Sequence, residues 1–193
     1  MGVIKTALEI ALERTEQVKS DKSSIDQFEA KQRGKKTANA FLAGEVDISE
    51  EIKKTDAAQR ESLKQGIFDV LISQIALPSG REDEKRIEMI GKGLAAVINN
   101  SRFSAMYKQL AQLFSQYLQE AAQYELAIRQ QYGPKLRQKE EELSRRMGRE
   151  VRIDPLQDPE FAAFYNQNMN TLKGNYEGLI EQAKEEARRM FEN

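Results

Sequence analysis

The sequence contains no cysteine and no histidine. Without cysteine the chain cannot form a disulfide, use a thiolate nucleophile or build a cysteine-based zinc site. Without histidine it lacks Ser-His-Asp triads, histidine metal sites and the usual proton shuttle at neutral pH. An enzyme of this composition would be left with carboxylate, lysine, serine and tyrosine chemistry. We therefore expect a protein that is not an enzyme and that carries no metal or other cofactor.

Long apolar runs and an excess of one charge are missing as well. No stretch approaches the roughly 18 apolar residues that a membrane span needs, so we expect no membrane partner. The net charge of −1 argues against a general nucleic-acid coat and against a polybasic membrane binder. Phosphate-binding, dinucleotide-binding and nucleophile-elbow motifs are absent. The sequence predicts a cytoplasmic protein.

Helix breakers are scarce, with four prolines and eleven glycines in 193 residues. Many positions instead hold alanine, glutamate, lysine, leucine, glutamine or arginine, which lose little entropy in a helix. Apolar residues recur every three or four positions in nearly every segment. The sequence thus predicts an all-α fold of about six helices, with helix in more than about two-thirds of the residues, against a base rate of one-third.

Breaks in the apolar pattern predict where these helices begin and end. The first is expected over 3–18, before the SDKSS sequence, and the second over 22–43, with Gly44 just beyond its end. A third, capped by Ser49, should reach residue 76, and a fourth should be capped by Ser79. The fifth carries the longest apolar pattern. The sixth should begin at Asp158-Pro159-Glu160, in the order cap, first and second helical residue.

The fifth helix has apolar residues at alternating intervals of four and three, the spacing of a coiled-coil seam. Its candidate interface residues are Phe103, Tyr107, Leu110, Phe114, Tyr117 and Tyr124. Leu113 and Leu118 widen this seam, which favours contact with two neighbours. We expect a homodimer anchored by Phe114 and Tyr117, because such seams are often completed by a second copy. Two other interpretations remain open: an intramolecular core, and a tyrosine-lined ligand pocket.

Pro134 lies inside the fifth helix, and the apolar pattern shifts register there, which predicts a kink. Residues 134–152 carry seven basic and four acidic residues, a net charge of +3, whereas residues 153–193 carry four and eight, a net charge of −4. Arms of opposite charge should pack antiparallel as a hairpin. We predict a single domain over 1–193, with a bundle base at 1–100 and a long coiled-coil-like hairpin at 101–193.

A basic patch comprises Lys31, Arg33, Lys35 and Lys36. It could contact phosphates, but a solvated helix face near a C-terminus explains it more simply. The charged hairpin end over 135–160 has the same two interpretations: a binding element, or an exposed helix with ion pairs at helical spacing.

The segments ALEIALERTE (Ala7–Glu16) and GKKTANAFLAGE (Gly34–Glu45) resemble the beginnings of small uncharacterised bacterial all-helical proteins. This resemblance implies a bacterial origin and no particular activity. Taken together, the sequence favours a non-enzymatic scaffold or protein-interaction module that self-associates. The alternative is a helical protein that binds a small ligand or nucleic acid.

Overall fold

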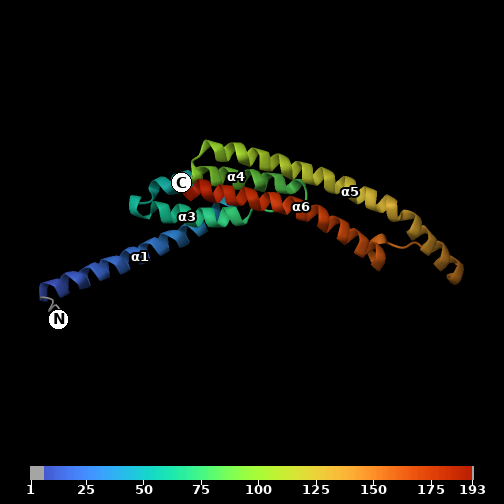
Figure 1. Ribbon diagram of the computed structural model, residues 1–193, viewed down its shortest axis with the longest axis horizontal. Coiled ribbons are helices and arrows are strands. Elements are labelled where there is room, and N and C mark those ends of the chain that lie inside the picture. Colours follow the sequence, from blue (N-terminus) through green and yellow to red (C-terminus); the bar gives the residue numbers. More distant parts are fainter. Residues whose placement is uncertain (1–6, 193) are drawn as a thin grey trace, which may run out of the picture. The chain divides into compact units, whose positions relative to one another are not determined.

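The computed structural model describes the backbone of residues 7–192 and the side chains of residues 23–192. Helix accounts for well over two-thirds of this part of the chain, which contains no β-strand, so the all-α prediction is confirmed. The described residues form six α-helices in chain order: α1 (Ala7–Leu42), α2 (Ile48–Lys54), α3 (Ala57–Ser73), α4 (Glu84–Ile98), α5 (Ser101–Met147) and α6 (Pro159–Glu192). Figure 1 labels all of them except α2. Short 3-10 helices, η1 (Arg81–Asp83) and η2 (Pro155–Gln157), precede α4 and α6. None of the described helices is both long and apolar enough to cross a membrane.

The chain divides into two compact units, one of Met1–Ile75 with Glu88–Phe103 and the other of Ala76–Ile87 with Ser104–Asn193. Neither unit is one continuous stretch, because the chain passes between them three times: after Ile75, within α4 and near the start of α5. The single-domain organisation with a base and a hairpin stays a prediction.

The break expected at the SDKSS sequence is wrong, because α1 continues through it to Leu42. Relative to alanine, serine, aspartate and lysine each destabilise a helix by about 0.7 kcal/mol at most. The helix therefore continues through these residues. The start expected at residue 3 lies outside the described residues. The end is as expected: Gly44 has a positive φ of 79°, and the N–H groups of Gly44 and Glu45 donate to the carbonyls of Phe41 and Ala40.

The third predicted helix is two helices, because the chain turns at Thr55. The Thr55 hydroxyl donates to the Glu51 carbonyl at 2.7 Å and accepts from Arg33 Nη2 at 3.0 Å. Its carbonyl accepts from Arg60 Nη2 at 3.2 Å. These bonds replace the helical ones that the break removes. Thr55 therefore has its hydroxyl and carbonyl bonded at the break, whereas Arg60 Nε is buried there without a partner.

Two predicted helix caps are also wrong. Asp47, rather than Ser49, caps α2, since its Oδ1 accepts the N–H of Glu50 at 3.0 Å. Ser79 does not cap a helix either. Its N–H donates to Asp83 Oδ2 at 2.7 Å, and η1 intervenes before α4 begins.

In the first unit, α1 and α3 pack together through two glycines. A Cβ atom on Gly34 would lie 3.0 Å from the carbonyl carbon of Leu63 and 3.1 Å from the Cα of Gly66. The two backbones are thus nearly in contact. Leu63, Ile67 and Leu71 of α3 are fully buried around this crossing.

In the second unit, α5 and α6 form the expected antiparallel hairpin. Tyr117 packs edge-on against Tyr176 with ring centroids 5.2 Å apart, and Tyr132 packs against Phe161 at 5.3 Å. The partner of the later α5 residue, Tyr132, thus comes earlier in α6 than the partner of Tyr117, so the two helices are antiparallel. The helix α5 stays continuous across Pro134, so the proline does not divide it into two helices.

Candidate functional site

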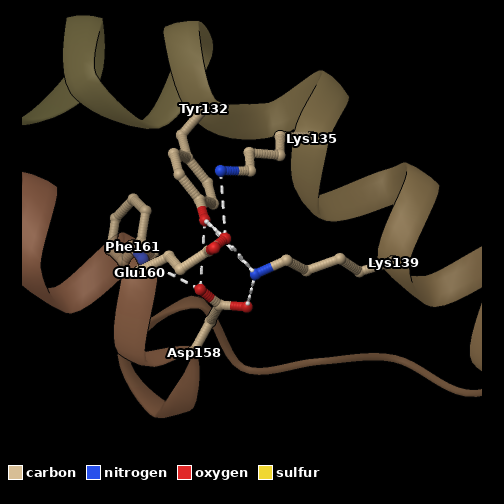
Figure 2. Close-up of polar contacts among 6 residues, drawn as sticks. All are labelled: Tyr132, Lys135, Lys139, Asp158, Glu160 and Phe161. Atoms are coloured by element: carbon tan, nitrogen blue, oxygen red, sulfur yellow. Dashed lines mark hydrogen bonds and ion pairs between the residues drawn. The ribbon is translucent and has the colours of Figure 1, made fainter.

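A polar cluster, in which only Tyr132 and Asp158 are buried, joins the beginning of α6 to α5, and Figure 2 shows its side chains. Tyr132, Lys135 and Lys139 come from one face of α5, at helical spacings of three and four. Asp158 and Glu160 come from the first turn of α6 and the residue before it. Lys139 is central, because its Nζ lies 2.6 Å from Asp158 Oδ2 and 2.6 Å from Glu160 Oε2.

The remaining contacts close the cluster. Lys135 Nζ lies 3.0 Å from Glu160 Oε2. The Tyr132 hydroxyl lies 3.1 Å from Asp158 Oδ1 and 3.2 Å from Glu160 Oε2. Asp158 Oδ1 also accepts the N–H of Phe161 at 2.8 Å, which confirms Asp158 as the cap of α6. One carboxylate therefore both begins the helix and binds it to its neighbour.

The cluster holds its groups in their ordinary charge states. Hydrogen bonds from Lys139 and from the Phe161 N–H lower the pKa of Asp158 to about 2. Lys139 and Lys135 lower the pKa of Glu160 to about 2. The same bonds raise the pKa of Lys139, while burial and the neighbouring Asp158 raise the pKa of Tyr132. Neither the lysine nor the phenol is poised to lose a proton near neutral pH, so this geometry suits a structural latch better than proton transfer.

The segment between α5 and α6 is also hydrogen-bonded to α5. The N–H of Ile153 donates to Glu140 Oε1 at 2.9 Å, and the N–H of Val151 donates to Ser144 Oγ at 2.9 Å. The opposite charges of these two arms predicted their antiparallel packing but not the specific partners. The available signal was the helical spacing of Tyr132, Lys135 and Lys139 on the positively charged arm.

The candidate interface residues lie mostly inside the fold. Phe103, Tyr107, Leu110, Phe114 and Tyr117 are buried, whereas Tyr124 is 41% exposed. The Tyr107 hydroxyl donates to the Ile87 carbonyl at 2.7 Å. Their role as a contact with a second copy stays a prediction, but a partner could reach the buried five only if the surrounding chain moved.

The basic patch is divided between two sides of α1. Lys31 Nζ lies 2.8 Å from Asp69 Oδ2 on α3. Burial of Asp69 opposes its ionisation, but hydrogen bonds from Lys31 and Gln65 outweigh this effect and lower its pKa. Arg33 instead bonds Thr55. Two of the four cations thus hold the first unit together, which leaves a weaker phosphate-binding surface than the sequence suggests.

The second unit contains a cavity of about 590 Å³. Its walls come from the segment before α4, from the middle of α5 and from α6. They include Tyr117, the only candidate interface residue that lines it. Within the described residues, no cluster of three or more acidic side chains could hold a metal ion.

Residues 49–189 match a protein family described as Family of unknown function (DUF6657). The chain belongs to this family. The DUF6657 region contains the Tyr132 cluster and the cavity, but not the two N-terminal segments on which the resemblance to bacterial proteins rests. Neither the curated proteins nor the solved structures include a match to the chain.

Proposed function

We propose that this protein is a non-enzymatic helical scaffold or protein-interaction module that associates with a second copy of itself. The observation that carries the proposal is the exposure of two large apolar side chains on α1. Ile25 is 57% exposed and Phe28 is 63% exposed. They lie about one turn apart, on the side of α1 roughly opposite the Gly34 contact with α3.

Exposed apolar side chains that share a helix face mark interaction surfaces. Fully burying one large apolar side chain contributes about 1.5–3 kcal/mol. The sequence also carries Val18 and Ala11 seven and fourteen residues before Ile25, which is the repeat of a coiled-coil position. A second helix placed along this line would bury Ile25 and Phe28.

The charges of α1 favour a second copy in antiparallel orientation. Residues 7–29 hold six acidic and three basic residues, a net charge of −3, whereas residues 30–42 hold four basic and no acidic residues. Parallel pairing would place the four cations of one helix beside the same four of the other. Antiparallel pairing about Ile25 and Phe28 instead places residues 27–40, with four basic and one acidic residue, beside residues 13–26, with three basic and four acidic residues, so net charges of +3 and −1 face each other. Surface charges of this kind determine orientation more than affinity.

A bacterial source, a cytoplasmic location and the coiled-coil character of the seam in α5 belong to the same proposal. The N-terminal resemblance supports the source. Nucleic-acid binding is not part of the proposal, because Lys31 and Arg33 already bond Asp69 and Thr55.

Light scattering on the purified chain tests self-association. We expect a dimer at roughly tens of micromolar and a folded monomer for Phe28→Glu, because a buried unpaired carboxylate would oppose the contact. Leu126→Glu is the matched control, since Leu126 is 58% exposed on α5, and it should remain dimeric. A monomeric wild type, or a Phe28→Glu protein that still dimerises, would refute the α1 contact. Phe114→Glu is a poor probe, because Phe114 is 3% exposed and the change would disturb folding.

A further inference from the structure

The cavity of the second unit has the size of a small-molecule site. Its volume of about 590 Å³ falls within the range of about 300–1,000 Å³ that is typical of such sites. Apolar side chains supply much of its lining, including Leu77, Leu118, Ala121, Ala122 and Met169. The aromatic walls are held in place by neighbouring rings, Tyr117 by Tyr176 at 5.2 Å and Tyr165 by Phe161 at 5.9 Å.

Two hydrogen-bond donors of this cavity lack partners. Tyr117 is 5% exposed and Tyr165 is half-buried, and across residues 23–192 neither hydroxyl has a hydrogen-bond partner. Tyr176, which lies next to Tyr117, differs because its hydroxyl bonds Glu120. Burial raises the pKa of Tyr117, and so do the nearby Glu177 and Tyr165, so this phenol keeps its proton. Neither hydroxyl is sealed from solvent, since Arg60 Nε is the only fully buried side-chain polar atom of the described residues that lacks a partner. Both phenols are therefore free to donate to an acceptor oxygen of a ligand that enters the cavity.

Charges of both signs border the cavity without being paired to each other. Lys173 and Glu177 both line it, one helical turn apart on α6. In the part of the chain that the structure describes, neither forms an ion pair. The third charged lining residue, Glu125, is already paired with Arg129 at 2.9 Å. The free groups are therefore one ammonium, one carboxylate and two phenol donors.

We infer that this cavity binds a small zwitterion with a large apolar side chain, of the kind represented by a free apolar α-amino acid. The ligand carboxylate accepts hydrogen bonds from Tyr117 and Tyr165 and pairs with Lys173. Its ammonium group pairs with Glu177, and its side chain fills the apolar part of the cavity. The inference is independent of the α1 dimer, because no residue of α1 lines the cavity.

Titration calorimetry with L-phenylalanine and L-leucine tests this site on the full chain. At least one of them should bind saturably with a Kd of about 1 mM or tighter. N-acetyl-L-phenylalanine lacks the ammonium group and 2-phenylethylamine lacks the carboxylate. Each should bind at least about tenfold more weakly than L-phenylalanine, since each leaves one charged lining group unpaired.

Variants locate the binding. Tyr117→Phe and Lys173→Met should each weaken binding at least about fivefold, and Ala121→Phe should abolish it by filling the cavity. Tyr124→Phe and Lys108→Met are the matched controls, because both residues are exposed on α5 outside the cavity, and they should bind like the wild type. Circular dichroism confirms that each variant is folded. The inference fails if neither amino acid binds, if the two truncated probes bind as tightly as phenylalanine, or if folded Tyr117→Phe and Lys173→Met bind unchanged.

Discussion

Lys139 and Asp158 are nineteen positions apart in the sequence, yet Lys139 Nζ lies 2.6 Å from Asp158 Oδ2. The pair joins the two helices of the hairpin at the point where α6 begins. Asp158 is almost completely buried, so removing the lysine leaves a buried carboxylate with fewer donors. The stability of the hairpin should therefore depend on this contact.

Replacement of Lys139 tests whether the Tyr132 cluster acts as a structural latch between α5 and α6. Lys139→Met keeps most of the apolar stem but removes the ammonium group that bonds both Asp158 and Glu160. We expect the midpoint of thermal unfolding, followed by circular dichroism, to fall by a few degrees. Lys108→Met is the control, and it should unfold close to the wild type because Lys108 is an exposed residue of the same helix. Equal midpoints for the two variants would show that the latch adds nothing to stability.

Acid should weaken the same contact in a defined pH range. The pKa values of Asp158 and Glu160 are lowered in the folded chain from ordinary values of 3.8 and 4.5 to about 2. A carboxyl pKa that is lower in the folded chain stabilises the fold at any pH above the ordinary carboxyl pKa. This stabilisation is lost as the pH falls toward the pKa of the folded chain. The unfolding midpoint should therefore decrease between about pH 4.5 and about pH 2.

A variant assigns this pH dependence to the latch. In Lys139→Met the two carboxyl pKa values should return toward normal, so the decrease in midpoint over the same pH range should be smaller than in the wild type. Parallel curves for the two proteins would assign the acid sensitivity to other carboxylates.

Replacing a glycine with alanine should have opposite effects on stability at Gly66, which contacts α1, and at Gly174, where an added Cβ would contact no neighbouring helix. Gly66→Ala introduces a Cβ that meets the backbone of α1, including the Lys35 nitrogen at 3.1 Å, and overpacking of this kind costs about 1–3 kcal/mol. Gly174→Ala on α6 meets nothing within 4 Å. It should stabilise the protein by about 0.5–1 kcal/mol through helix propensity.

Urea unfolding of both alanine variants measures these two changes. A Gly66→Ala protein as stable as the wild type would mean that α1 and α3 separate readily and that the close contact is not required. The Gly174→Ala protein controls for the propensity gain that accompanies any glycine-to-alanine change within a helix.

Local signals in the sequence predicted most of what depends on neighbouring residues. Helix-forming composition and apolar spacing predicted an all-α fold, because both act within a few turns of one helix. The Asp158-Pro159 sequence predicted the start of α6 for the same reason: a cap bonds an N–H three residues away. The opposite charges of the two arms predicted their antiparallel pairing, since charge acts over several ångströms and does not depend on exact partners.

Features that depend on residues far apart in the sequence appeared only in the tertiary structure. Thr55 ends α2 with the help of Arg33, which is twenty-two positions away, and no local pattern indicates this bond. The candidate interface was assigned to residues such as Phe114 because a seam pattern looks the same whether its own chain or a second copy covers it. Sequence alone therefore determined the all-α fold class and which helix faces are apolar, but not every helix boundary. The tertiary structure decided what each face meets, because burial of a side chain depends on which helices pack around it and not on its own sequence position.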